Sequence, residues 1–131
     1  HNFYYNKNRL FQSNIWPNTF PTSCISLKKK YFLEFISLIK KNKFALLEID
    51  FRICCLFSIY KDNFLILNEN LTLYRQVNNG IMSEYKKFQK KWWIKRGQAF
   101  EFFKTLKKDF NQNFNYSLDF FINKIIIFFI K

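Results

Sequence analysis

The chain has only two glycines and two prolines among its 131 residues. This scarcity excludes a Gly-rich phosphate loop, a collagen and a flexible linker, because each of these needs many residues of one or both types. The chain is also 49% apolar and 22% aromatic, which is typical of a protein that folds rather than of a disordered segment. A chain of this length fits one domain at most.

Charged side chains supply the second constraint. The 22 Lys and Arg residues outnumber the 9 Asp and Glu residues, and the formal net charge is +13. Such a charge favours an anionic partner: nucleic acid, an acidic membrane surface or a phosphorylated substrate. An A/T-rich genome is the alternative source of the basicity, because its codons enrich Lys over Arg, together with Phe, Asn, Ile and Tyr. The only histidine is His1, so we expect no zinc site and few schemes of nucleophilic catalysis.

Cysteines and apolar runs bear on the cell compartment. Cys24, Cys54 and Cys55 are odd in number, and two of them are neighbours in an apolar run, so the sequence predicts buried thiols in a reducing cytosol. The longest apolar stretch, Leu118–Ile130, falls short of the roughly 20 residues that span a bilayer. We therefore expect a cytoplasmic protein that can lie on the inner face of a membrane without crossing it.

Apolar residues recur at helical spacing in several segments. The spacing predicts helices over 28–41, 48–60 and 84–110 and a last helix that ends at Lys131, with Ser117 as its N-cap. The third helix carries many lysines, which we interpret as a solvated face, and an apolar stripe, which we interpret as core packing. The stripe residues are Tyr85, Phe88, Trp92, Ala99, Phe103, Leu106 and Phe110. Gly97 marks a weak point in the middle of this helix.

Two further segments have the pattern of strands. Residues 22–27 predict a short strand, and 64–67 and 71–76, separated by Asn-Glu-Asn, predict a β-hairpin. In the second hairpin strand Arg75 shares a face with two leucines, so it needs an anionic partner. The expected fold class is therefore α+β, helix-rich, with one short strand, a hairpin and about four helices.

Glu48 and Asp50 are the only candidates for a general base. They open a largely apolar helix, where desolvation in a cleft would raise the basicity of a carboxylate. The remaining acidic residues lie among lysines or in turns. Asp50 has an alternative role, since a carboxylate in the first turn is favoured by the N-terminus of its helix.

The order of three motifs resembles the C-terminal half of family 2 glycosyltransferases of the GT-A type. The motifs are PTSCISL before a helix, LEIDFR at residues 47–52, and LILNENLTLYRQ at residues 65–76, followed by a basic helix that contains tryptophan. The resemblance covers residues 20–105. Two positions depart from the family pattern: Ile49 replaces an acidic residue, and Gln76 and its successors stand where the family has a histidine.

The resemblance implies an enzyme that transfers a sugar from a nucleotide-sugar donor to a glycan or lipid-linked acceptor in surface polysaccharide synthesis. It implies Asp50 as the catalytic base and Glu48, Arg75 and Gln76 as substrate-binding residues, with Arg75 near the donor diphosphate. Residues 1–110 would then form the acceptor-side part of the transferase domain, and 111–131 a C-terminal helix or tail. The family also implies a divalent metal, but its Asp-x-Asp motif is not in this sequence. We expect the chain to be the tail of a longer protein and to be inactive alone.

Two other classes of function stay open. In the first, Tyr85, Trp92 and Trp93 form with the surrounding lysines a stacking and electrostatic surface for RNA or single-stranded DNA. Trp92 lies on the expected core stripe, which disfavours this class. In the second, a peripheral membrane protein, the basic helix meets anionic lipid while Leu118–Ile130 settles into the interface. This class is compatible with transfer to a lipid-linked acceptor.

Overall fold

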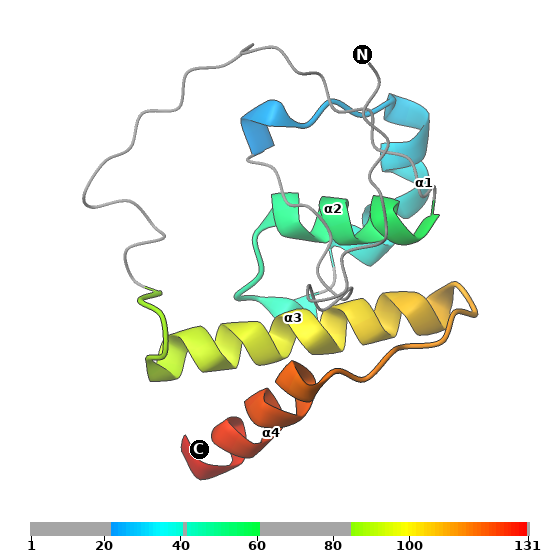
Figure 1. Cartoon of the computed structure of the whole chain (residues 1–131). Coiled ribbons are helices and arrows are strands. Elements are labelled where there is room, and N and C mark those ends of the chain that lie inside the picture. The colour runs from blue at the N-terminus through cyan, green and yellow to red at the C-terminus, as the bar shows by residue number, and fades with distance from the viewer. Residues whose placement is uncertain (1–21, 41, 61–84, 131) are drawn as a thin grey trace, which may run out of the picture.

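The computed structural model describes residues 22–40, 42–60 and 85–130, and the long helix α3 runs through the middle of this part (Figure 1). Helices α1 and α2 lie on one side of α3, and α4 lies on the other (Figure 1). The elements in chain order are η1 (Thr22–Cys24), α1 (Lys29–Ile39), η2 (Asn42–Phe44), α2 (Ile49–Tyr60), α3 (Lys90–Asp109) and α4 (Leu118–Ile130), where η marks a short 3-10 helix.

The expected α+β class is wrong for the described residues, which contain helices and no strand. The segment expected as a strand at 22–27 begins instead with η1, in which the Ile25 amide donates to the Thr22 carbonyl at 3.2 Å. A lone strand has no neighbour to pair with, so its backbone groups are satisfied locally by a tight turn. The expected hairpin at 64–76, with Arg75 and Gln76, lies outside the described residues.

The four expected helices are confirmed, with one boundary moved. The third begins at Lys90 rather than at residue 84, because Phe88 has φ 67°, a left-handed conformation that cannot continue a helix. The indole N–H of Trp93 donates to the carbonyl of Phe88 at 3.1 Å and holds this turn. The predicted cap is also present: Ser117 Oγ accepts from the amide of Phe120 at 3.2 Å at the start of α4.

Helix α3 is buried on two faces, not on the single stripe that the sequence predicts. Phe102 packs against Phe44 of η2 with ring centroids 5.3 Å apart, and Phe100 packs against Phe120 of α4 at 5.4 Å. The expected stripe residues Ala99, Phe103 and Leu106 are buried as well. A helix placed between two neighbours buries residues all round, which a one-sided pattern does not anticipate.

Helix α4 packs closely against Gly97 of α3. A Cβ atom at this position would lie 2.4 Å from Cδ1 of Ile127 and 3.1 Å from Oδ1 of Asn123. The side chain of Asn123 is buried and donates to the backbone carbonyl of Trp93 at 3.1 Å. The expected weak point is therefore a contact site, where the missing side chain lets two helices pack together.

Arg52 of α2 is the buried charge of this fold, with 8% of its surface exposed. Its guanidinium donates to the carbonyls of Leu47 at 3.1 Å and Ile39 at 2.7 Å, and also to that of Phe44. These acceptors come from the end of α1, from η2 and from the turn before α2. Burial lowers the pKa of the guanidinium, but arginine is so basic that it stays charged at neutral pH.

We predict that Arg52→Met lowers the free energy of unfolding by about 3 kcal/mol, because three buried carbonyls lose a charged donor. Arg96→Met is the matched control. Arg96 is half-exposed and pairs with Asp119, so its loss should cost less than about 1 kcal/mol. Urea unfolding followed by circular dichroism measures both values. Equal stabilities for the two variants would contradict the role given to Arg52.

Candidate functional site

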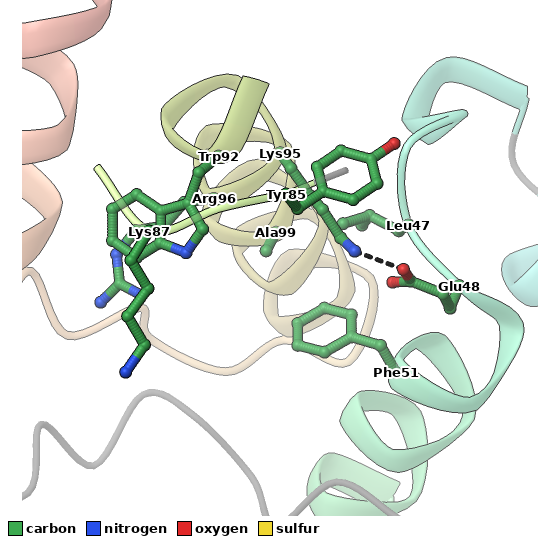
Figure 2. Close-up of a pocket in the computed structure, with 9 residues that line it drawn as sticks. All are labelled: Leu47, Glu48, Phe51, Tyr85, Lys87, Trp92, Lys95, Arg96 and Ala99. Atoms are coloured by element: carbon green, nitrogen blue, oxygen red, sulfur yellow. Dashed lines mark hydrogen bonds and ion pairs between the residues drawn. The ribbon is translucent and has the colours of Figure 1, made fainter. Parts of the chain in front are cut away.

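A pocket of about 310 Å³ lies between the N-terminal end of α2 and the first half of α3, together with the segment that leads into α3 (Figure 2). This volume is at the lower end of the range for small-molecule sites. Its walls combine aromatic rings with cations and one carboxylate. The lining residues are Leu47, Glu48, Phe51, Tyr85, Lys87, Trp92, Lys95, Arg96 and Ala99.

The charged groups of the pocket are partly paired. Lys95 Nζ forms an ion pair with Glu48 Oε1 across the pocket and also lies 4.2 Å from the centroid of the Tyr85 ring (Figure 2). The guanidinium of Arg96 lies 5.1 Å from the Trp92 ring and pairs with Asp119 of α4. Within the described part of the chain, Lys87 has no ion-pair partner and is exposed at the rim.

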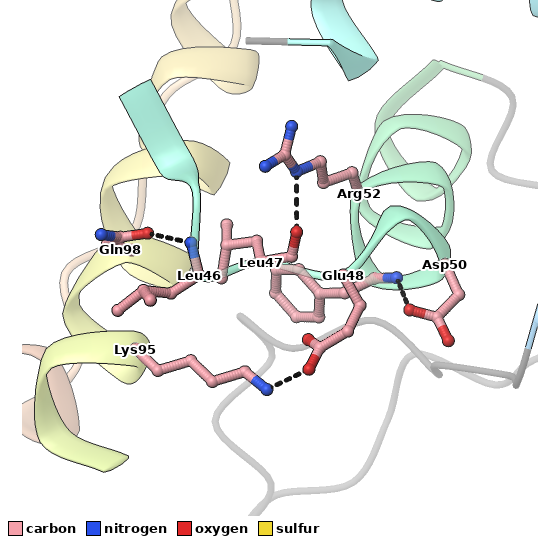
Figure 3. Close-up of polar contacts among 8 residues, drawn as sticks. Leu46, Leu47, Glu48, Asp50, Arg52, Lys95 and Gln98 are labelled. Atoms are coloured by element: carbon pink, nitrogen blue, oxygen red, sulfur yellow. Dashed lines mark hydrogen bonds and ion pairs between the residues drawn. The ribbon is translucent and has the colours of Figure 1, made fainter. Parts of the chain in front are cut away.

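Local packing sets the position of Glu48. The amide of Leu46 donates to Oε1 of Gln98 on α3 at 3.0 Å, and the neighbouring Leu47 is buried against the core (Figure 3). The carbonyl of Leu47 is one of the acceptors of Arg52. The turn is therefore fixed on both sides, and it directs the carboxylate of Glu48 toward Lys95.

Asp50 does not line this pocket. Its Oδ1 accepts from the amide of Phe51 at 2.7 Å within the first turn of α2, and the carboxylate lies farther from α3 than that of Glu48 (Figure 3). A carboxylate in this place interacts favourably with the N-terminus of the helix. This geometry fits the alternative that the sequence left open for Asp50, and its role as a catalytic base stays a prediction.

Of the four site residues predicted from the sequence, the structure brings Glu48 into a pocket, and Asp50 lies near it. Arg75 and Gln76 lie outside the described residues. Two cations of the pocket were not predicted as site residues: Lys95 is one of the lysines expected on a solvated face, and no sequence pattern singled out Arg96. Their spacing carried a signal, since both lie within one helical turn of Trp92 and share its side of α3.

The cysteines divide into two kinds. Cys54 and Cys55 are buried, as the sequence predicts, but Cys24 is exposed. Burial, with a smaller effect of Cys54, raises the pKa of the Cys55 thiol well above its usual value. Because the thiolate is the reactive form, Cys55 is protected both by exclusion of reagents and by its protonation.

We predict that the native chain reacts with one equivalent of the thiol reagent DTNB within minutes, at Cys24. All three thiols should react in guanidinium chloride, which removes the burial. The variant Cys24→Ser should remove the fast reaction. Fast labelling of two or three thiols in the native chain, measured by absorbance at 412 nm, would contradict the packing of α2.

The described residues show neither a metal site nor a membrane-spanning helix. No group of three or more His, Cys, Asp and Glu side chains in that part of the chain is placed to hold a metal ion. None of the helices described is long and apolar enough to cross a membrane.

Comparison of the chain with models of known protein families, with curated proteins and with solved structures finds no match. The resemblance to family 2 glycosyltransferases therefore rests on the motifs in the sequence alone.

Proposed function

We propose that this chain is part of a glycosyltransferase and that the pocket binds a nucleotide-sugar. The observation that carries the proposal is the position of Glu48. This residue was predicted to bind substrate from its sequence motif, and it lies in a pocket whose other walls are aromatic rings and cations. The glycan or lipid-linked acceptor is part of the proposal as the resemblance implies it.

The chemistry of the lining suits the parts of such a ligand. The half-buried rings of Tyr85 and Trp92 offer faces on which a base or a sugar can stack. Lys87 at the rim supplies positive charge for a diphosphate, and Arg96, whose guanidinium donates to both carboxylate oxygens of Asp119, adds a second cation to the lining. The ionised carboxylate of Glu48 has only acceptor oxygens, so it can accept hydrogen bonds from sugar hydroxyls.

Binding of UDP-glucose, followed by isothermal titration calorimetry, tests the pocket. Trp92→Ala should weaken binding about tenfold or more, because it removes a stacking face. Tyr116→Ala is the control, since this exposed aromatic residue does not line the pocket. Absence of binding at millimolar UDP-glucose, or an equal loss from both variants, would contradict the proposal.

A second pair of variants tests the roles of the two carboxylates, Glu48 and Asp50, separately. Glu48→Gln should weaken UDP-glucose binding, because the amide cannot form the ion pair with Lys95 and offers one acceptor oxygen in place of two. Asp50→Asn should leave binding unchanged, because Asp50 does not line the pocket. In an enzyme that contains this chain, a catalytic base at Asp50 would show instead as a loss of sugar transfer by several orders of magnitude.

Nucleic-acid binding is the second candidate, and one observation favours it. Phe88 is 73% exposed and lies beside Trp92 and Trp93, with ring centroids 5.5 and 6.1 Å away. Exposed lysines surround this group: Lys86, Lys87, Lys90 and Lys91. Such a group can stack on bases and contact phosphates.

Trp93 distinguishes this candidate from the first, because it belongs to the exposed aromatic group but does not line the pocket. If the chain binds single strands, affinity for a random 20-nucleotide RNA should fall steeply with salt and fall further with Trp93→Ala, measured by fluorescence anisotropy. No binding at low salt would remove this candidate.

A further inference from the structure

The strongest feature outside the pocket is an apolar stripe along α4. Six large apolar side chains on this helix are exposed although α4 packs against α3. They are Leu118, Phe121, Ile122, Ile125, Phe128 and Phe129. Their spacing of three, one, three, three and one residues places them on one face of the helix. We call these six residues the α4 stripe.

Helix α4 is held on α3 by its opposite face. Phe120 and Asn123 are buried there, and Asn123 donates to the carbonyl of Trp93. Two ion pairs, Arg96 with Asp119 and Lys124 with Glu101, also connect α3 and α4. The α4 stripe is therefore not the face of α4 that packs on the core, because the opposite face makes the contacts with α3.

The most exposed end of the stripe lies at a basic end of the molecule. Phe120 contacts Phe100, while Asn123 contacts the earlier Trp93, so α4 runs antiparallel to α3. Phe128 and Phe129, 78% and 79% exposed, therefore lie toward the start of α3. Exposed lysines gather at that start: Lys86, Lys87, Lys90 and Lys91. Together α3 and α4 carry eight basic and three acidic residues, a net charge of +5.

We propose that the α4 stripe docks this chain on the surface of an anionic lipid bilayer. A 13-residue helix is about 20 Å long, which is too short to cross the hydrocarbon layer but suits a helix lying in the interface. Its apolar side chains enter the interface while the neighbouring lysines meet acidic headgroups. None of the six stripe residues lines the pocket, although Lys87 lies both at the pocket rim and among these lysines, and the proposal does not rest on the proposed function.

Two other binding partners, a second copy of this chain and nucleic acid, fit the stripe less well. A second copy would bring together two chains that each carry a net charge of +13, at a cost in repulsion. Nucleic acid needs cations and stacking rings, whereas three of the six stripe residues are aliphatic: Leu118, Ile122 and Ile125.

Flotation with lipid vesicles tests the proposal. The chain should float with vesicles of 70% phosphatidylcholine and 30% phosphatidylserine, and binding should fall at least tenfold with pure phosphatidylcholine. The double variant Phe128→Ser/Phe129→Ser should lose at least tenfold in binding to the anionic vesicles, because two rings no longer enter the interface. Leu33→Ser/Ile49→Ser is the matched control, since both residues are exposed apolar side chains outside the stripe. It should bind as the unaltered chain does.

Circular dichroism and the sedimentation coefficient of each variant complete the test. Equal helix content shows that the variants fold, so that lost flotation reports on the surface. Three results would overturn the proposal: no flotation of the unaltered chain, equal flotation of both double variants, or equal binding to charged and uncharged vesicles. A dimer that Phe128→Ser/Phe129→Ser converts to a monomer, with no flotation, would assign the stripe to a second copy instead.

Discussion

Backbone carbonyls from three successive pieces of chain converge on the guanidinium of Arg52. Such carbonyls sit at a helix end and in a turn, where regular helical partners are missing, so a charged donor is needed to satisfy them once they are buried. Arg52 thereby fixes η2 and the turn at Leu47, which places Phe44 against α3 and directs Glu48 into the pocket. A single buried cation thus links the packing of the helices to the geometry of the candidate site.

The packing of helix α3 depends on the Arg52 contacts on one face and on Gly97 on the other. On the first face it meets η2 and α2 and supplies Trp92 and Lys95 to the pocket. On the second face the absence of a side chain at Gly97 lets α4 approach, so that Asn123 can be buried. The same helix therefore supports two surfaces of different chemistry, a pocket of rings and charges and an apolar stripe beside lysines.

The sequence predicts the helices well because their apolar spacing is local information, as in α2 and in the Ser117 cap of α4. It does not predict the start of α3, which is set by the left-handed conformation of Phe88. It also assigns Lys95 to solvent and does not single out Arg96, since pairing with Glu48 and Asp119 depends on which helices meet. Nothing local marks Arg52 as a buried donor either, because its acceptors come from separate pieces of chain. The strand expected at 22–27 is wrong because no described strand lies beside it to pair with.

Helix α3 supports two binding surfaces, the pocket and the α4 stripe that packs beside it, and amide hydrogen exchange read by mass spectrometry tests this most directly. The chain would be compared alone, with UDP-glucose, and with vesicles that contain 30% phosphatidylserine. We expect UDP-glucose to slow exchange at residues 47–51 and 92–96, and vesicles to slow it at residues 118–130, with little crossover. Protection of one common segment by both additives, or protection of neither segment, would contradict the claim.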